Sequence, residues 1–154
     1  MVVIVPIVVL AVAIAAVYVM SLRRPDVTGP TATGPQCRGT AACFSDKLEY
    51  IVDGDTLDVG TTRIRLTLVN SPEVGQPGYQ EAKDFTAQTC PIGTTALVDE
   101  DDGQTGGSYG RMIALVYCGN TNLNAALLQS GNAVLVTDFC AVGEFAGDSW
   151  TGCP

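Results

Sequence analysis

The 154-residue chain has room for one domain, 47% of its residues are apolar, and its formal charge is −8. It contains no histidine, which excludes every mechanism that needs an imidazole as a base or a metal ligand. Beyond residue 25 there are six Lys and Arg against sixteen Asp and Glu, a balance of −10, so nucleic acid is repelled at long range and could bind only at a local site.

The first 20 residues carry no charge and are nearly all Val, Ile, Ala and Leu. At about 1.5 Å of rise per residue, a helix of this length matches the hydrocarbon core of a bilayer. A cleaved signal peptide is the alternative, but no charged residue precedes the apolar run and no small-x-small site precedes Arg23. We predict an uncleaved anchor at 1–22, a Pro/Gly/Thr-rich linker at 23–42 and a folded domain at 43–154.

Two features disagree about the side of the membrane on which the domain lies. Arg23 and Arg24 follow the apolar run, and the positive-inside rule would keep the domain in the cytoplasm. An even number of cysteines in a small domain instead indicates three disulfides and an oxidising compartment, with intracellular disulfides of hyperthermophiles as the exception. Zinc is disfavoured because there is no CxxC pair. We give the cysteines more weight and predict a membrane-anchored domain on the extracellular side.

Proximity in the sequence suggests how these cysteines pair, among the many pairings that six allow. The suggested disulfides are Cys37–Cys43, Cys140–Cys153 and, by remainder, Cys90–Cys118.

Periodicity and turn residues predict short strands separated by turns. The predicted strands cover 48–53, 56–59, 61–69, 94–98 and 110–118, with a final strand at 133–136. Helical spacing predicts a helix at 79–89, and Asn122 can cap a second helix at 123–130. One or two further helical turns are predicted around 144–150. These elements predict an α+β domain with two to three helices.

The stretch 63–73 carries the functional prediction. Its first half alternates polar and apolar residues, which indicates a strand with one buried face, and Pro72 ends that strand because it has no N–H to donate. Arg65 therefore lies on a rigid strand. Three polar residues follow at the strand's exit: Asn70, Ser71 and Glu73. Such a cluster is typical of a reactive site, and an exposed strand with ordinary surface charges is the alternative.

The available chemistry is that of carboxylates and arginines. Asp53 and Asp55 flank a tight turn, and together with the residues at the strand exit they offer oxygen ligands that suit Ca²⁺ or Mg²⁺. Arg65 and Arg111 each interrupt apolar strand sequence, and a guanidinium matches phosphate geometry through paired donors. These groups are the components needed for attack of water on a phosphodiester. For Asp53 we favour a turn carboxylate that caps its own backbone.

Two other features have structural interpretations. In the acidic stretch 99–108, a second calcium loop is excluded because Gly103 and Gly110 do not fall in the required register. We predict that this stretch is a solvated, mobile loop near Arg111. Trp150 is interpreted as a core anchor for the tail rather than a platform for base stacking.

Four linked motifs give a more specific signal. In chain order they are I-V-D-G-D-T-L at 51–57, R-L-T-L-V-N-S-P-E at 65–73, Y-G-R at 109–111 and N-L-N-A-A-L-L-Q-S-G at 122–131. Together they resemble the staphylococcal nuclease (thermonuclease) family over about 48–136. The resemblance implies a five-stranded OB-fold-type β-barrel with packed helices. It also implies Ca²⁺-dependent hydrolysis of DNA and RNA that leaves 3′-phosphates.

The resemblance also implies a role for individual residues. Asp55 would be a carboxylate ligand of Ca²⁺, and Ser71 would serve the metal through its backbone carbonyl. Arg65 and Arg111 would bind the phosphate from two sides, and Glu73 would align or deprotonate the attacking water. Tyr109 would lie beside the phosphate of the bound nucleotide.

Three positions depart from the family pattern. Asn70 stands where the best-known member has a second metal-binding aspartate, so Ca²⁺ should bind more weakly. Ser108 replaces a lysine and Thr137 a nucleotide-contacting tyrosine, which predicts a higher KM. We therefore predict a monomeric, membrane-anchored Ca²⁺-dependent endonuclease whose partner is its DNA or RNA substrate. The alternative is a catalytically silent nuclease-like module that binds nucleic acid or a protein.

Overall fold

The computed structural model describes residues 34–154. The predicted membrane anchor and the linker up to residue 33 lie outside these residues. Within residues 34–154, no helix combines the length and the apolarity that crossing a membrane requires.

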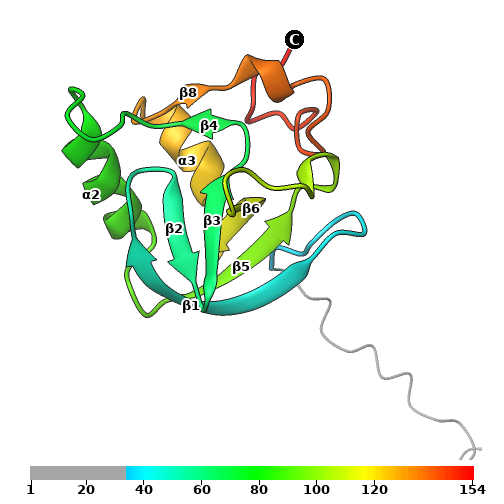
Figure 1. Cartoon of the computed structure of the whole chain (residues 1–154), viewed down its shortest axis with the longest axis horizontal. Coiled ribbons are helices and arrows are strands. Elements are labelled where there is room, and N and C mark those ends of the chain that lie inside the picture. Colours follow the sequence, from blue (N-terminus) through cyan, green and yellow to red (C-terminus); the bar gives the residue numbers. More distant parts are fainter. Residues whose placement is uncertain (1–33) are drawn as a thin grey trace, which may run out of the picture. The chain divides into compact units, whose positions relative to one another are not determined.

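Five strands form a closed barrel (Figure 1). They are β1 (Cys43–Ile51), β2 (Thr56–Val59), β3 (Thr62–Leu66), β5 (Thr95–Glu100) and β6 (Met112–Cys118). Their order is β3-β2-β1-β5-β6 with antiparallel neighbours, and a parallel pairing of β3 with β6 closes the barrel. The closed α+β barrel agrees with the predicted OB-type fold.

Smaller elements surround the barrel. A short strand β7 (Thr121–Asn122) pairs with β6, and β4 (Val69–Asn70) forms a separate two-stranded ladder with β8 (Val134–Leu135). The two α-helices of the described region are α2 (Tyr79–Thr89) and α3 (Leu123–Gln129), and the short 3₁₀ helices are η1 (Asp102–Gln104) and η2 (Thr137–Phe139). As predicted, the Asn122 side chain caps α3 by accepting a hydrogen bond of 2.9 Å from the backbone N–H of Ala125.

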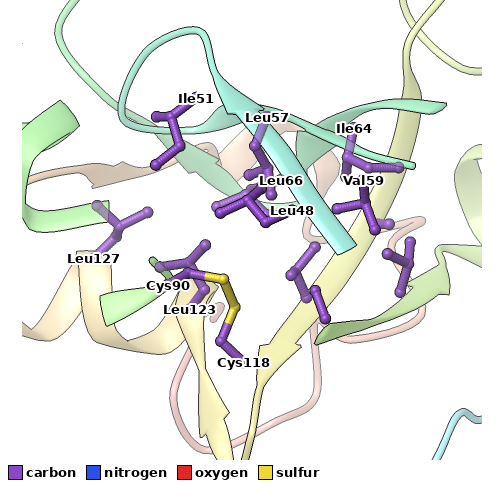
Figure 2. Close-up of a cluster of buried hydrophobic side chains, with 14 of the residues drawn as sticks. Leu48, Ile51, Leu57, Val59, Ile64, Leu66, Cys90, Cys118, Leu123 and Leu127 are labelled. Atoms are coloured by element: carbon purple, nitrogen blue, oxygen red, sulfur yellow. A yellow bond between two sulfur atoms is a disulfide. The ribbon is translucent and has the colours of Figure 1, made fainter. Parts of the chain in front are cut away.

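The alternation of β3 has the predicted consequence for packing. Ile64 and Leu66 are buried in the barrel core, whereas Arg63 and Arg65 lie on the other face. Figure 2 shows leucines, isoleucines and a valine from β1, β2 and β3 in one cluster with the Cys90–Cys118 disulfide, which is part of this core. A truncation such as Leu57→Ala would leave a cavity there and cost about 2–5 kcal/mol.

The three disulfides are Cys37–Cys43, Cys90–Cys118 and Cys140–Cys153. These are the pairs that proximity in the sequence suggested. A second, smaller core of Leu68, Leu115 and Phe145 lies under the tail, and Trp150 packs against both cores, so its interpretation as a core residue is confirmed.

Three predicted elements differ in the structure. The first strand begins at Cys43 instead of Leu48, because residues 43–47 pair with β5 while the rest of the strand pairs with β2. The predicted strand 61–69 is divided at Leu68, whose φ of 62° is left-handed. The helical turns predicted at 144–150 are absent, and that part of the described chain forms irregular turns.

Candidate functional site

Arg65 is held at the surface of the barrel by three acceptors. Its Nη1 lies 2.7 Å from Asp55 Oδ1 and donates to the carbonyl oxygen of Val69 at 2.8 Å. Its Nη2 donates to Asn70 Oδ1 at 2.9 Å. The side chain is only 14% exposed, and its buried neighbours Ile64 and Leu66 fix the strand beneath it. The guanidinium is therefore preorganised by β3, by the turn that precedes β2 and by the residues of β4.

Asp55 is a buried carboxylate between β2 and the strand exit. Its Oδ2 accepts a hydrogen bond from the backbone N–H of Ser71, and its Oδ1 accepts one from Thr56 Oγ1 at 3.2 Å. Burial raises the pKa of the Asp55 carboxyl above its ordinary value, and the Arg65 guanidinium opposes that rise. The ion pair with Arg65 thus favours the charged form of a carboxylate that has little contact with solvent.

The turn before Asp55 is fixed by its close approach to α2. Thr86 on α2 donates its hydroxyl to the carbonyl oxygen of Gly54 at 2.6 Å. A Cβ at Gly54 would lie 2.7 Å from the Cβ of Ser71 and 2.8 Å from that of Ala82, so no larger residue fits there. Asp53 accepts a hydrogen bond of 3.0 Å from the Asp55 backbone N–H, which confirms its interpretation as a turn carboxylate.

Arg111 lies in a tight turn just before β6. Its Nε donates to the carbonyl oxygen of Ser108 at 3.0 Å and its Nη2 to Ser108 Oγ at 3.3 Å. The centroid of the Tyr109 ring is 5.9 Å from the guanidinium carbon of Arg111, and this tyrosine is 98% exposed. Arg111 forms no ion pair with a carboxylate within residues 34–154, whereas Arg38, Arg63 and Arg65 each do. It is therefore the arginine best placed to attract an anion.

The two site arginines line one cleft of about 570 Å³. The parallel pairing of β3 with β6 places Arg65 opposite Ile113, two residues after Arg111. Asn70, Ser108, Thr137 and Phe139 also line this cleft. Each guanidinium is anchored through part of its donors only: Arg65 Nε and Arg111 Nη1 have no acceptor among the described residues. Both can still donate to an oxyanion in the cleft.

Glu73 is not brought into this cleft. It lies three residues beyond Asn70, its side chain is exposed, and its backbone N–H donates to Gln76 Oε1 at 2.8 Å. Asp55 and Ser71 likewise lie behind the cleft wall, beside Arg65, rather than in its lining. Within the part of the chain that the structure describes, no three His, Cys, Asp or Glu side chains form a metal-binding group.

The prediction of a solvated loop at 99–108 was wrong for two aspartates. Asp99 ends up in β5 and Asp101 just beyond it, and both are buried, with exposed fractions of 1% and 0%. Asp101 accepts a hydrogen bond of 2.9 Å from the backbone N–H of Gly103. That contact is an Asx turn, and the Asp-x-Gly spacing could have indicated it.

Two comparisons with known proteins bear on the family of this chain. The family model described as "Staphylococcal nuclease homologue" matches residues 63–144, more than half of the chain. An uncharacterized protein of Bacillus anthracis is 30% identical over 102 residues, which cover 60% of this chain and 48% of that protein. The chain therefore spans about half the length of the curated relative that it matches.

Proposed function

Since the chain belongs to the staphylococcal nuclease family, we propose that it is a Ca²⁺-dependent phosphodiesterase that hydrolyses DNA, RNA or both. The observation that carries the proposal is the meeting of Arg65 and Arg111 in a single cleft. These two residues lie far apart in the sequence. Each has an N–H group without an acceptor among the described residues. Two guanidinium groups on one concave surface of an otherwise acidic domain are suited to hold a single phosphodiester.

In the proposed reaction the two arginines bind non-bridging oxygens of the same phosphate. They stabilise the charge that builds up on these oxygens as water attacks phosphorus and the bond from phosphorus to the 5′-oxygen breaks. The water gives up a proton and the leaving 5′-oxygen takes one up, so the products are a 3′-phosphate and a 5′-hydroxyl. Arg65 is rigid because of its three protein acceptors, so little reorganisation is needed when that charge develops. Glu73, which is exposed three residues beyond Asn70, would align or deprotonate the water, and Tyr109 would lie beside the nucleotide's phosphate.

The proposed metal ligands offer the oxygen types that a hard cation prefers. Asp55 Oδ1 and Asn70 Oδ1 both contact the Arg65 guanidinium, and Asp55 Oδ2 contacts the backbone of Ser71. By the resemblance to the family, the Asp55 carboxylate, the Asn70 amide oxygen and the Ser71 backbone carbonyl would hold Ca²⁺. When bound, the ion would supply Lewis-acid stabilisation of the phosphate. Only one of these donors is charged, and it is already paired with Arg65, so we expect weak affinity.

The decisive experiment is digestion of end-labelled DNA and RNA oligonucleotides by the full chain, with Ca²⁺ or with a chelator. The proposal expects products with 3′-phosphates in Ca²⁺ and no cleavage in chelator. Arg111→Gln should abolish cleavage, whereas Arg63→Gln, which removes an exposed arginine paired with Asp58, should not. Cleavage that is unaffected by chelator would refute the metal requirement.

Glu73 is tested by Glu73→Gln, with Glu81→Gln in the first turn of α2 as the matched control. If Glu73 handles the attacking water, its variant should lose kcat by about 100-fold or more while KM changes little. A Glu73→Gln protein that digests DNA at the full rate would show that the water is activated by another group.

A catalytically silent module that binds nucleic acid or a protein is the second candidate. The observation in its favour is that Asp55 and Asn70, the side chains proposed to hold the metal, are both engaged by Arg65. This candidate predicts that the wild-type chain binds an oligonucleotide or another partner and leaves DNA and RNA intact at every Ca²⁺ concentration.

We further propose that the protein is monomeric and membrane-anchored, with its domain on the extracellular side. The three disulfides support an oxidising compartment. Alkylation in intact cells without reductant should find no reactive thiol. Six free thiols would instead place the domain in the cytoplasm.

A further inference from the structure

Asp101 is a fully buried carboxylate with no ion-pair partner in residues 34–154. Its Oδ1 accepts hydrogen bonds of 2.9 Å from the backbone N–H groups of Gly103 and Glu144. Its Oδ2 accepts one from Thr67 Oγ1 at 2.7 Å and one from Gln104 Nε2 at 2.9 Å. Burying a charge without a counter-ion is costly, so this complete set of four donors is what keeps the carboxylate inside.

These four donors come from three separate segments that meet behind the cleft. Thr67 belongs to the corner between β3 and β4, Gln104 ends η1, and Glu144 belongs to the tail. Thr67 and Gln104 line the same cleft as Arg65 and Arg111. Asp101 therefore bonds to two residues of the cleft lining that come from separate segments.

A series of backbone hydrogen bonds continues from Asp101 to Arg111. The N–H of Gln104 donates to the carbonyl oxygen of Asp101 at 2.8 Å, and the N–H of Gly107 donates to that of Gln104 at 2.9 Å. Ser108 and Arg111 then exchange two bonds of 2.9 and 3.0 Å. A Cβ at Gly107 would lie 2.5 Å from the carbonyl oxygen of Arg111, so the two ends of this turn are in direct contact.

The carboxylate also determines how the Gln104 amide is oriented. Gln104 Nε2 donates to both Asp101 Oδ2 and Thr67 Oγ1, at 2.9 and 3.1 Å. The Thr67 hydroxyl has already donated its hydrogen to Asp101, so both of these atoms act as acceptors toward the amide. A flipped amide would place its oxygen against two acceptors, and the charged carboxylate therefore excludes that orientation.

On the premise of the proposed function, we propose that Asp101 is a positioning residue for the phosphate-binding cleft, acting through Gln104 and the turn that carries Arg111. It touches no substrate. It holds the segment 102–111 against the corner at Thr67, and this segment sets where the Arg111 guanidinium lies relative to Arg65.

The neighbouring Asp102 provides a matched control. It is exposed, and it accepts hydrogen bonds from the backbone N–H groups of Thr40 at 2.9 Å and Ala41 at 2.8 Å. It thus binds the segment next to the Cys37–Cys43 disulfide instead of the cleft wall. Two adjacent aspartates with comparable numbers of hydrogen bonds therefore serve different parts of the chain.

The experiment compares Asp101→Asn with Asp102→Asn in the full chain, at a temperature where both remain folded. Because displacing a binding group by about 1 Å can cost 100-fold, we expect Asp101→Asn to lower kcat/KM for oligonucleotide cleavage by roughly 10- to 100-fold. Asp102→Asn should change it by less than about twofold, although both variants lose stability. Equal kcat/KM values for the two variants would overturn the proposal.

A second readout does not depend on catalysis. Amide hydrogen exchange should become faster at Gly107, Ser108 and Arg111 in Asp101→Asn, while β1 and β2 stay protected, and it should be unchanged there in Asp102→Asn. Should Asp101→Asn fail to fold, Thr67→Val and Gln104→Ala each remove one partner of the carboxylate and must show the same local effect. A wild-type chain that neither cleaves nor binds an oligonucleotide would refute the proposed function, whereas unchanged exchange in all three variants would refute the role of Asp101.

Discussion

Arg65 Nη1 and Asp55 Oδ1 lie 2.7 Å apart, and Asp55 is buried, with an exposed fraction of only 2%. The Val69 carbonyl and the Asn70 side chain complete the arrangement by accepting hydrogen bonds from the same guanidinium. A buried ion pair of this kind is weak support for stability, because desolvation offsets the attraction. We interpret it as a device that fixes the orientation of Arg65.

Arg65→Lys should retain the positive charge and lose the function. A lysine is a single point donor and cannot bridge Asp55, Val69 and Asn70 while also holding a phosphate oxygen. We expect kcat/KM to fall by about 100- to 1000-fold, as for the loss of a group that stabilises a developing oxyanion. Arg63→Lys, two residues earlier on the same strand, is the control in the same cleavage assay. Equal activities of the two variants would show that Arg65 does not act on the substrate.

Asn70→Asp should strengthen Ca²⁺ binding. The change adds a negative charge at an oxygen that already lies beside Asp55 through the shared Arg65 contact. We expect Kd for Ca²⁺ to fall about tenfold, equivalent to about 1.4 kcal/mol, measured by calorimetry on the substrate-free protein. Asn120→Asp, in the turn after β6 and outside the cleft, should leave Kd unchanged. An unchanged Kd in Asn70→Asp would place the calcium site elsewhere.

Asp99 and Asp102 should affect the pH dependence of stability in opposite directions. Burial raises the pKa of the Asp99 carboxyl, whose Oδ1 has no hydrogen-bond partner among residues 34–154, whereas hydrogen bonds from Ala41 and Thr40 lower the pKa of Asp102. The pKa of Asp99 is higher in the folded protein than in the unfolded chain, where it is about 3.9. Its contribution to stability is therefore present below the unfolded pKa and is lost as the pH rises through the folded pKa. The pKa of Asp102 is lower in the folded protein than in the unfolded chain. Its contribution to stability is therefore present above the unfolded pKa and is lost as the pH falls through the folded pKa.

Urea unfolding of Asp99→Asn and Asp102→Asn across the acid to neutral range measures both effects. Relative to wild type, Asp99→Asn should gain in free energy of unfolding as pH rises, and Asp102→Asn should lose. Parallel curves for the two variants would contradict the assigned environments.

Removing Cys90–Cys118 should destabilise the domain more than removing Cys37–Cys43. The former lies in the barrel core and joins residues 28 apart, whereas the latter joins residues six apart near the surface. The double variant Cys90→Ala/Cys118→Ala should lose about 2–5 kcal/mol of unfolding free energy. Urea unfolding without reductant, with Cys37→Ser/Cys43→Ser as the comparison, measures the difference. Equal losses of unfolding free energy in the two double variants would contradict this account, in which Cys90–Cys118 stabilises the domain both by packing in the core and by closing the longer loop.

Much of the barrel could be predicted because local patterns and the fold agree. The alternation around Ile64 specifies β3, and the Asn122 cap specifies the start of α3. The division of the strand at Leu68 could not be predicted in the same way. A left-handed leucine is unfavourable by itself and is accepted only because its side chain reaches the small core of Leu115 and Phe145.

Only part of the candidate site could be predicted from the sequence. Arg65, Asn70, Ser71 and Asp55 could be grouped because a short chain segment and a tight turn bring them together. The burial of Asp101 could not be foreseen, since a run of acidic residues with glycines is ordinarily solvated. Its partners Thr67 and Glu144 are distant in sequence, and only the closed barrel brings them to it.

The parallel contact between β3 and β6 has a consequence for the timing of activity. It joins strands separated by more than forty residues, and long-range parallel pairing is slow to form because the entropy of loop closure must first be overcome. Until β3 has paired with β6, no backbone contact holds the segment that carries Arg65 beside the segment that carries Arg111. Under the proposed function, a chain in which this pairing has not formed would not cleave nucleic acid, and the appearance of cleavage would report that folding has finished.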